Sequence, residues 1–381
     1  MPSASRTGYL PTLDGWRAIA ILAVLLDHVV GYSSLHQVPV LRAVSRTGPN
    51  GVSLFFAISG FLICSRLLEE QNAFGRISLR GFYIRRVCRI LPPAMLYLIV
   101  IAILSLLSVI VVEPAELLSS VFFFRNYLPH SWLSRAWGGY TIHYWSLAVE
   151  EHFYLLWPAA LVLLGKMRAR WFAVLGALGI AGWRMWEFHH HWLEHKIPGL
   201  LIGSRTDIRL DGLLLGCLVA LLLDDKRIRS LTVRYYKTWI WILFVAAYVG
   251  LQLLQKTRTY SLTESALLPL IVAGTVIRPQ TWMGRVLEVP LLKWTGRLSY
   301  SIYLWQQLFS VPALGLTPLF FQKLPLNLAL LFLVAWISYE FIERPFIRLG
   351  HRLAPPPTDG RDDLTSSSQI EEKVAEVPQA K

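Results

Sequence analysis

Two ionisable side chains, Arg17 and His28, lie inside the first long apolar run of this sequence, which extends from Leu13 to Gly31. On a helix, eleven residues make almost three turns, so both side chains point from one face, about 16 Å apart along the axis. Ionisable groups within an apolar span usually face a cavity or a partner. Each residue alone could be structural, because Arg17 could extend to the membrane surface and His28 could cap the helix end.

A second cluster of ionisable side chains lies in the stretch from His143 to Tyr154. His143, Glu150 and Tyr154 share one helix face because their spacings are seven and four residues. This segment should cross the membrane in the opposite direction to the first run, which gives Glu150 and His28 similar depths. A carboxylate beside an imidazole commonly orients a general base. We predict that His28 and Glu150 are catalytic, although a structural buried pair would also explain them.

A basic cluster opens the third apolar run. Arg86 and Arg89 are three residues apart and Arg85 and Arg89 are four apart, so the arginines share a helix face. Arginine side chains make bidentate contacts with phosphate groups. We predict that Arg86 and Arg89, together with Arg17, bind an anionic part of a substrate. The alternative is ordinary membrane topology, which places arginines at cytoplasmic helix ends.

Four more charges open a later apolar run: Arg205, Asp207, Arg209 and Asp211. Their spacing puts the two arginines on one face and the two aspartates on another, which favours ion pairs with neighbouring helices. We therefore predict that Arg209 and Asp211, like Glu151, shape the cavity rather than react. Gly212 and Gly216 should let helices approach closely.

Histidines also gather between positions 189 and 195. His191 and His195 have the spacing of a metal-binding pair, but no ordered third ligand accompanies them. We predict a solvated loop there and no metal site.

The elements that must hold these side chains are transmembrane helices. Of the 381 residues, 54% are hydrophobic and 16% are charged, whereas soluble domains carry about 25% charged residues. A helical span needs roughly 20 mostly apolar residues, and such segments fill nearly the whole chain. We predict an all-α polytopic membrane protein with ten spans, at residues 13–32, 51–68, 91–112, 142–165, 171–188, 207–223, 238–255, 262–277, 298–316 and 325–343.

The distribution of basic residues predicts the orientation of these spans. The segments that follow even-numbered spans hold 21 Lys and Arg residues, against 10 in the opposite loops. Positive residues favour the cytoplasmic side, so both termini should be cytoplasmic in a multi-pass protein of the cytoplasmic (inner) membrane. Membrane topology also explains the net charge of +13, so we expect membrane lipids as partners and no nucleic acid.

The chain changes character near its end. From Ala354 onward it is rich in proline and polar residues and poor in apolar ones, a composition that cannot bury enough surface to fold. We predict one transmembrane domain over residues 1–350 and a disordered cytoplasmic tail over residues 351–381.

Several stretches, in order along residues 9–350, resemble acyltransferase family 3, the bacterial membrane O-acyltransferase or cell-surface O-acetylase type. The stretches are Leu13-Asp-Gly-Trp-Arg17-Ala-Ile-Ala-Ile-Leu with His28, Gly51-Val-Ser-Leu-Phe-Phe-Ala-Ile-Ser-Gly60-Phe-Leu, Arg86-x-x-Arg89, Trp145-Ser-Leu-Ala-Val-Glu150-Glu151-His-Phe-Tyr, Arg209-Leu-Asp211-Gly, Leu298-Ser-Tyr-Ser-Ile-Tyr-Leu-Trp305 and Phe341-Ile-Glu343-Arg-Pro345-Phe. One motif alone is weak evidence, whereas the ordered set is specific.

The resemblance implies a ten-helix fold, acyl-CoA (expected to be acetyl-CoA) as donor, and a hydroxyl of a glycan, lipid-linked sugar or other glycosylated acceptor. Arg17 and His28 match the family's essential pair, Arg86 and Arg89 its second basic motif, and Glu150 the carboxylate of its fourth helix. No permanently bound cofactor is implied. Many members also append a hydrolase-like domain, where this sequence has only the short tail.

One position departs from the pattern. Gln306 stands after Leu-Trp where many members have histidine, so no catalytic role is assigned to it.

The leading hypothesis is an acyl-CoA-dependent O-acyltransferase. His28 would act as general base oriented by Glu150, and Arg17, Arg86 and Arg89 would bind the donor. Direct transfer and an acyl-histidine intermediate both remain open, as do the acceptor's identity and the oligomeric state. The alternative is a transporter or flippase of a glycan precursor, since intramembrane charges would also serve a translocation path.

Overall fold

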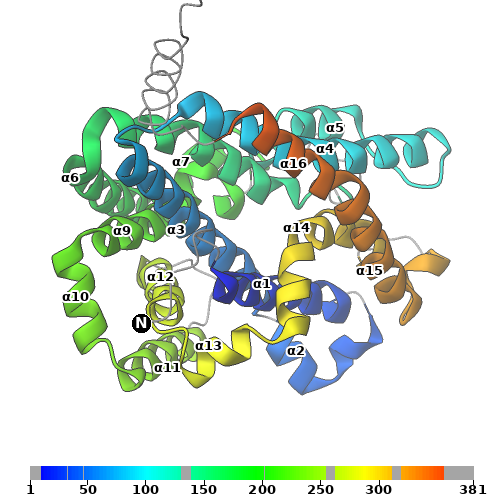
Figure 1. Cartoon of the computed structure of the whole chain (residues 1–381). Helices are drawn as coiled ribbons and strands as arrows, with labels where there is room; N and C mark the ends of the chain where they lie inside the picture. The colour runs from blue at the N-terminus through cyan, green and yellow to red at the C-terminus, as the bar shows by residue number, and fades with distance from the viewer. Residues whose placement is uncertain are drawn as a thin grey trace, which may run out of the picture.

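Helices make up most of the residues that the structure, a computed structural model, describes, which are residues 10–31, 33–45, 47–129, 139–200, 202–254, 262–310 and 319–355. No strand occurs in those ranges (Figure 1). The α-helices are α1 Pro11–Gly31, α2 Pro39–Ser45, α3 Gly48–Phe74, α4 Leu79–Leu106, α5 Pro114–Val121, α6 Tyr144–His190, α7 Trp192–Lys196, α8 Thr206–Arg209, α9 Asp211–Asp224, α10 Lys226–Tyr235, α11 Thr238–Leu254, α12 Leu262–Ile277, α13 Trp282–Leu287, α14 Pro290–Ser310, α15 Leu326–Ser338 and α16 Arg344–Leu353. Short 3₁₀ turns are η1 Ser34–Gln37, η2 Arg125–Tyr127, η4 Ile202–Ser204 and η5 Phe320–Gln322, and η6 Tyr339–Glu343 is a π-helix.

All ten predicted spans overlap these helices, so the all-helical prediction is confirmed for the described residues; residue 32 of the first span, residue 255 of the seventh and residues 311–316 of the ninth lie outside them. The fourth and fifth predicted spans lie on either side of Gly165 in α6, where two helices meet at a kink because that glycine has φ 69° and ψ 168°. Other boundaries differ. The helix of the third predicted span, α4, begins at Leu79 rather than at residue 91. The Ser78 hydroxyl caps it by accepting a hydrogen bond from the Gly81 amide at 3.1 Å.

Helix length and composition identify fewer candidate membrane spans among the described residues than the ten predicted. Four described stretches are long and apolar enough to cross a bilayer: Pro39–Phe74, Leu79–Leu106, Tyr144–His190 and Leu326–Leu353. A fifth would be formed by α10 and α11 if this pair, bent by 88°, is one span. Ten spans and cytoplasmic termini stay predictions.

The outer surface of the helical assembly supports a membrane location. Leu106, Leu163 and Leu253 are each more than 80% exposed, and many further leucines and tryptophans lie on the same outward faces. Such a surface suits lipid rather than water. α16 ends at Leu353, three residues into the segment predicted as a tail, and residues 356–381 lie outside the described ranges.

Helix α1 is the centre of the packing that forms the site. It packs against α3 on one side and α14 on another, while α9 packs against α3 and α6, and α16 lies along α4 (Figure 1). Their apolar side chains form one continuous core. Ionisable residues on α1, α3, α4, α6 and α14 can therefore converge.

The contact between α3 and α9 is as close as the glycine spacing predicted. A Cβ atom added at Gly216 would collide with the Ala57 carbonyl oxygen and the Phe61 amide nitrogen. The Cys217 thiol also donates to the Gly60 carbonyl oxygen at 3.2 Å. Only a residue without a side chain allows the two backbones to touch here.

Replacing Gly216 by alanine should therefore destabilise the fold. Overpacking of a close-packed interface costs about 1–3 kcal/mol, so we expect a lower thermal unfolding midpoint for the purified variant in detergent. Gly179→Ala in α6 is the matched control, because no atom lies within 4 Å of the added Cβ. Equal midpoints for the two variants would show that α3 and α9 do not pack as described.

Candidate active site

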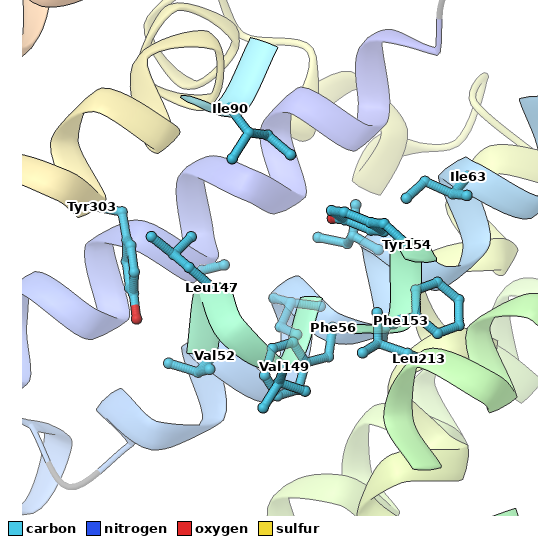
Figure 2. Packing of buried hydrophobic residues seen from close by; sticks show 14 of the residues in the cluster. Val52, Phe56, Ile63, Ile90, Leu147, Val149, Phe153, Tyr154, Leu213 and Tyr303 are labelled. Carbon is cyan, nitrogen blue, oxygen red and sulfur yellow. The ribbon is translucent and has the colours of Figure 1, made fainter. Parts of the chain in front are cut away.

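A pocket opens among α1, α3, α4, α6 and α14. It encloses about 830 Å³ of empty space, counted to its open mouth. Its wall is formed by Arg17, Val52, Phe55, Phe56, Ile58, Ser59, Leu62, Arg86, Arg89, Ile90, Ser146, Leu147, Glu150, Glu151, Tyr154, Ser299, Tyr300 and Tyr303. In Figure 2, Tyr303 and Tyr154 stand on opposite sides of Leu147, with Ile90 across from Val52. The wall along α3 runs from Leu62 to Val52, ten residues or about 15 Å of helix.

One end of the pocket carries the three arginines predicted to bind an anion. Arg17 comes from α1, and Arg86 and Arg89 come from the first turns of α4. The guanidinium carbon of Arg86 lies 4.8 Å from the centre of the Tyr154 ring, a cation–π contact. Arg85 turns away from the pocket and donates to Glu70 at 3.1 Å and to the Ala354 carbonyl. The arginine face predicted on this helix is therefore divided between the pocket and a structural contact.

Two carboxylates of α6, Glu150 and Glu151, stand beside these arginines in the pocket wall. Glu150 accepts hydrogen bonds from the Ser59 hydroxyl at 3.0 Å and from the Tyr154 hydroxyl at 2.8 Å, one on each oxygen. Both glutamates interact electrostatically with Arg86. The predicted shared face of Glu150 and Tyr154 is confirmed by this direct contact.

His28 contacts helix α14. Its Nδ1 makes a 3.1 Å hydrogen bond with Oε1 of Gln306, and it interacts electrostatically with His143, the residue that precedes α6. Since His143 precedes Glu150 by seven residues, Glu150 lies about 10 Å further along α6. His28 and Glu150 have different hydrogen-bond partners, and the orientation of His28 by Glu150 stays a prediction.

Gln306, to which the sequence assigned no role, is the hydrogen-bond partner of His28. It is completely buried, and it follows the pocket residue Tyr303 by three positions, less than one turn of α14. A signal was present in the sequence, since two adjacent glutamines interrupt an apolar helix. The contact of Gln306 with His28 depends on the packing of α1 against α14, which the sequence does not give.

Glu343 is a second residue to which the sequence assigned no role. It ends the π-helix η6, is 1% exposed, and accepts a hydrogen bond from the Ser301 hydroxyl at 2.9 Å. Arg17 and Arg89 interact electrostatically with it. A π-helical turn is rare and often marks a functional position. Here it carries a third carboxylate to the arginine end of the pocket.

The charges at the start of α8 and α9 make ion pairs away from the pocket. Arg205 contacts Glu187 at 2.7 Å with both side chains fully buried, and also contacts Asp207. Asp211 pairs with Arg184 at 2.9 Å.

Arg209 lies against the wall of the pocket. Its guanidinium carbon lies 5.6 Å from the ring centres of both Phe56 and Trp145. Phe56 is itself a pocket residue, so Arg209 supports the wall from behind.

The histidine-rich segment before α7 is exposed. His191 contacts Glu194 at 2.8 Å, with both side chains more than 40% exposed. Within the described ranges, no three His, Cys, Asp or Glu side chains are grouped as a metal site would need.

Comparison with known proteins identifies the family. Residues 10–341 match the acyltransferase 3 family, described as an acyltransferase domain. The chain belongs to this family. The resemblance seen in the ordered motifs is thus confirmed, and the pocket is the candidate active site of an acyltransferase-family protein. No solved structure matches the chain.

Three relatives illustrate the similarity. The chain is 29% identical over 367 residues to a protein of Staphylococcus aureus strain COL provisionally named an O-acetyltransferase. It is 27% identical over 380 residues to the peptidoglycan O-acetyltransferase OatA of Listeria monocytogenes, and 29% identical over 370 residues to YrhL of Bacillus subtilis, provisionally named a peptidoglycan O-acetyltransferase. Each alignment covers 90% of this chain but only 56–58% of the relative.

The buried pair of Arg205 and Glu187 gives a test of which charges are structural. Glu187→Ala should leave Arg205 buried with one partner fewer and lower the unfolding free energy by about 3 kcal/mol or more. Glu194→Ala, which removes an exposed carboxylate nearby, should change it by less than about 0.5 kcal/mol. Thermal unfolding of the purified proteins measures both, and an unchanged midpoint for Glu187→Ala would exclude a structural role.

Proposed function

We propose that this chain is a membrane-embedded O-acyltransferase that transfers an acetyl group from acetyl-CoA to a hydroxyl of a glycan. The observation that carries the proposal is the convergence of Arg17, Arg86 and Arg89 on one pocket. His28 lies outside the lining of this pocket, but it contacts Gln306, which follows the lining residue Tyr303 by three positions on α14. Family membership supports acyl transfer as the chemistry.

The arginine end suits the nucleotide part of the donor. Arginine forks bind phosphate oxygens in bidentate fashion, and three of them can neutralise the charges of the CoA phosphates. In the predicted topology this end faces the cytoplasm, where acyl-CoA is available. The narrow pantetheine arm would then follow the apolar wall, past Phe56 and Leu147, and bring the thioester toward His28.

The carboxylates would position these arginines. Glu150 and Glu151 stand beside Arg86, while Glu343 stands behind Arg17 and Arg89. Buried arginines without countercharges would be costly. With these carboxylates as countercharges, the guanidinium groups can stay oriented toward the pocket when no donor is bound. We therefore assign Glu150 to the donor end.

His28 would perform the proton transfer. With Gln306 Oε1 accepting a hydrogen bond from Nδ1–H, the lone pair of His28 is on Nε2, as a general base requires. His28 Nε2 takes the proton of the acceptor hydroxyl, and the hydroxyl oxygen bonds to the thioester carbonyl carbon. The carbon–sulfur bond then breaks, and the CoA thiolate takes the proton from the imidazolium. The products are an ester and CoA. An acyl-histidine intermediate would use the same residues.

The acceptor class is proposed from the relatives. Two of them carry names that specify peptidoglycan, so a peptidoglycan-type glycan is the first acceptor to test. In the predicted topology His28 lies toward the outer leaflet, on the side where a surface glycan is found. The chain would thus take the donor from one side of the inner membrane and the acceptor from the other.

His28 is the first residue to test. His28→Ala should reduce acetyl transfer by about 10²- to 10⁴-fold, the usual contribution of a general base, while the protein remains in the membrane. The assay follows labelled acetyl from acetyl-CoA to soluble peptidoglycan fragments. His190→Ala, which removes an exposed histidine, is the control. Full activity of the His28 variant would refute the assignment, and label that never leaves CoA with the unmodified protein would favour a transporter.

The donor role of the arginines gives a kinetic prediction. Arg89→Ala and Arg86→Ala should each raise KM for acetyl-CoA by about 10- to 100-fold, since a hydrogen bond to a charged group contributes about 1.5–3 kcal/mol. Arg80→Ala removes an exposed arginine at the start of the same helix and should leave KM unchanged. If all three variants show the same dependence on acetyl-CoA concentration, the donor does not bind at the pocket arginines.

A further inference from the structure

A polar cluster continues the pocket-lining face of α14 beyond the pocket itself. Ser299 and Tyr303 line the pocket, and Gln306 and Ser310 follow on the same face at spacings of three and four residues. Gln307 lies one turn before Ser310 on the adjoining face. We define Gln306, Gln307 and Ser310 as the α14 cluster. Its three side chains are at most 3% exposed.

Each residue of the α14 cluster keeps one buried polar atom without a hydrogen-bond partner among the described residues. These atoms are Nε2 of Gln306, Oε1 of Gln307 and Oγ of Ser310. A buried donor or acceptor left unpaired costs about 1–3 kcal/mol, and native proteins rarely leave three such groups together. This concentration of donors and acceptors indicates that something polar binds beside it.

The α14 cluster borders the proposed base directly. Gln306 uses Oε1 to contact His28 at 3.1 Å, which leaves its Nε2 for another partner. His143 lies close by, with its ring centre 5.6 Å from that of Tyr303 and 5.2 Å from that of Tyr97. A group bound at the α14 cluster would thus lie next to His28, among aromatic rings.

We infer that the α14 cluster is the acceptor subsite and binds a sugar ring through its hydroxyl groups. Amide and hydroxyl side chains can both donate to and accept from sugar hydroxyls. The three side chains carry no charge, which suits a neutral sugar, whereas the arginines at the other end suit phosphates. The two ends of the site therefore differ in charge: the arginine end would bind the donor and the uncharged end the acceptor. This inference rests on the proposed acyltransferase function.

Bound in this way, one sugar hydroxyl would lie beside Nε2 of His28 while neighbouring hydroxyls contact Gln307 and Ser310. The cluster would set which hydroxyl receives the acetyl group. It would take no proton itself, so its residues are positioning residues rather than catalytic ones.

The test compares two kinetic constants in the full-length protein reconstituted in lipid nanodiscs. The donor is labelled acetyl-CoA and the acceptor probe is the tetramer of N-acetylglucosamine. The combined variant Gln307→Leu and Ser310→Ala should raise KM for the tetramer at least about tenfold, because each neutral hydrogen bond contributes about 0.5–1.5 kcal/mol. KM for acetyl-CoA should stay within twofold.

Stability provides a second readout that separates binding from structure. Since the α14 cluster residues have unpaired polar atoms, Gln307→Leu should keep or raise the thermal unfolding midpoint. Gln71→Leu is the matched control. Its Oε1 is also buried without a partner among the described residues, but it lies in the last turns of α3, away from the cluster, and should leave both KM values unchanged.

The outcomes distinguish the inference from the proposed function. If the unmodified protein acetylates neither the tetramer nor soluble peptidoglycan fragments, the proposed function fails. If it acetylates a glycan and the combined variant has an unchanged acceptor KM, the α14 cluster is satisfied by water alone and the inference is wrong. A marked drop in the unfolding midpoint of Gln307→Leu would make the cluster structural and also overturn it. The single variant Ser310→Ala, a smaller change than the combined variant, repeats the comparison of KM for the tetramer with KM for acetyl-CoA.

Discussion

The attraction between three arginines and three carboxylates inside an apolar helical assembly is the interaction on which this structure depends. Arg17, Arg86 and Arg89 are held in a pocket wall where lone charges would be unfavourable. The compensating carboxylates come from α6 and from the π-helix η6. Because the charges belong to four elements distant in sequence, the arginines and carboxylates stay together only if each helix keeps its orientation and position in the assembly.

The rest of the fold can be understood as support for that balance. The close contact of α3 with α9 fixes the helix that carries Ser59, which hydrogen-bonds Glu150. The buried pairs of Arg205 with Glu187 and Arg184 with Asp211 tie α8 and α9 to α6. The buried ion pairs therefore have a structural role, whereas the charged residues of the pocket wall can also contact a ligand.

Helix periodicity explains how much of the site could be predicted from the sequence. The grouping of Arg86 with Arg89, and of Glu150 with Tyr154, depends only on spacing within one helix, and both groups line the pocket as expected. The contact of His28 depends on how α1 packs against α14, which spacing does not determine, so its contact with Gln306 could not be predicted. Glu343 was missed because a π-helix breaks the α-helical periodicity on which such predictions rest. The ten helical segments could be predicted because each is indicated by its own apolar run. The number that cross the membrane depends on the position of each helix relative to the bilayer, which an apolar run alone does not determine.

The π-helix η6 also affects how α16 packs against α4. A residue added to a helical turn rotates everything after it by roughly 100° relative to an uninterrupted α-helix. The turn that directs Glu343 inward therefore also determines which side of α16 faces α4, where Gly350 lies against Cys88. The position of the carboxylate that faces Arg17 and Arg89 and the packing of α16 against α4 both follow from this one extra residue. A lineage that lost this extra residue would have to replace both at once.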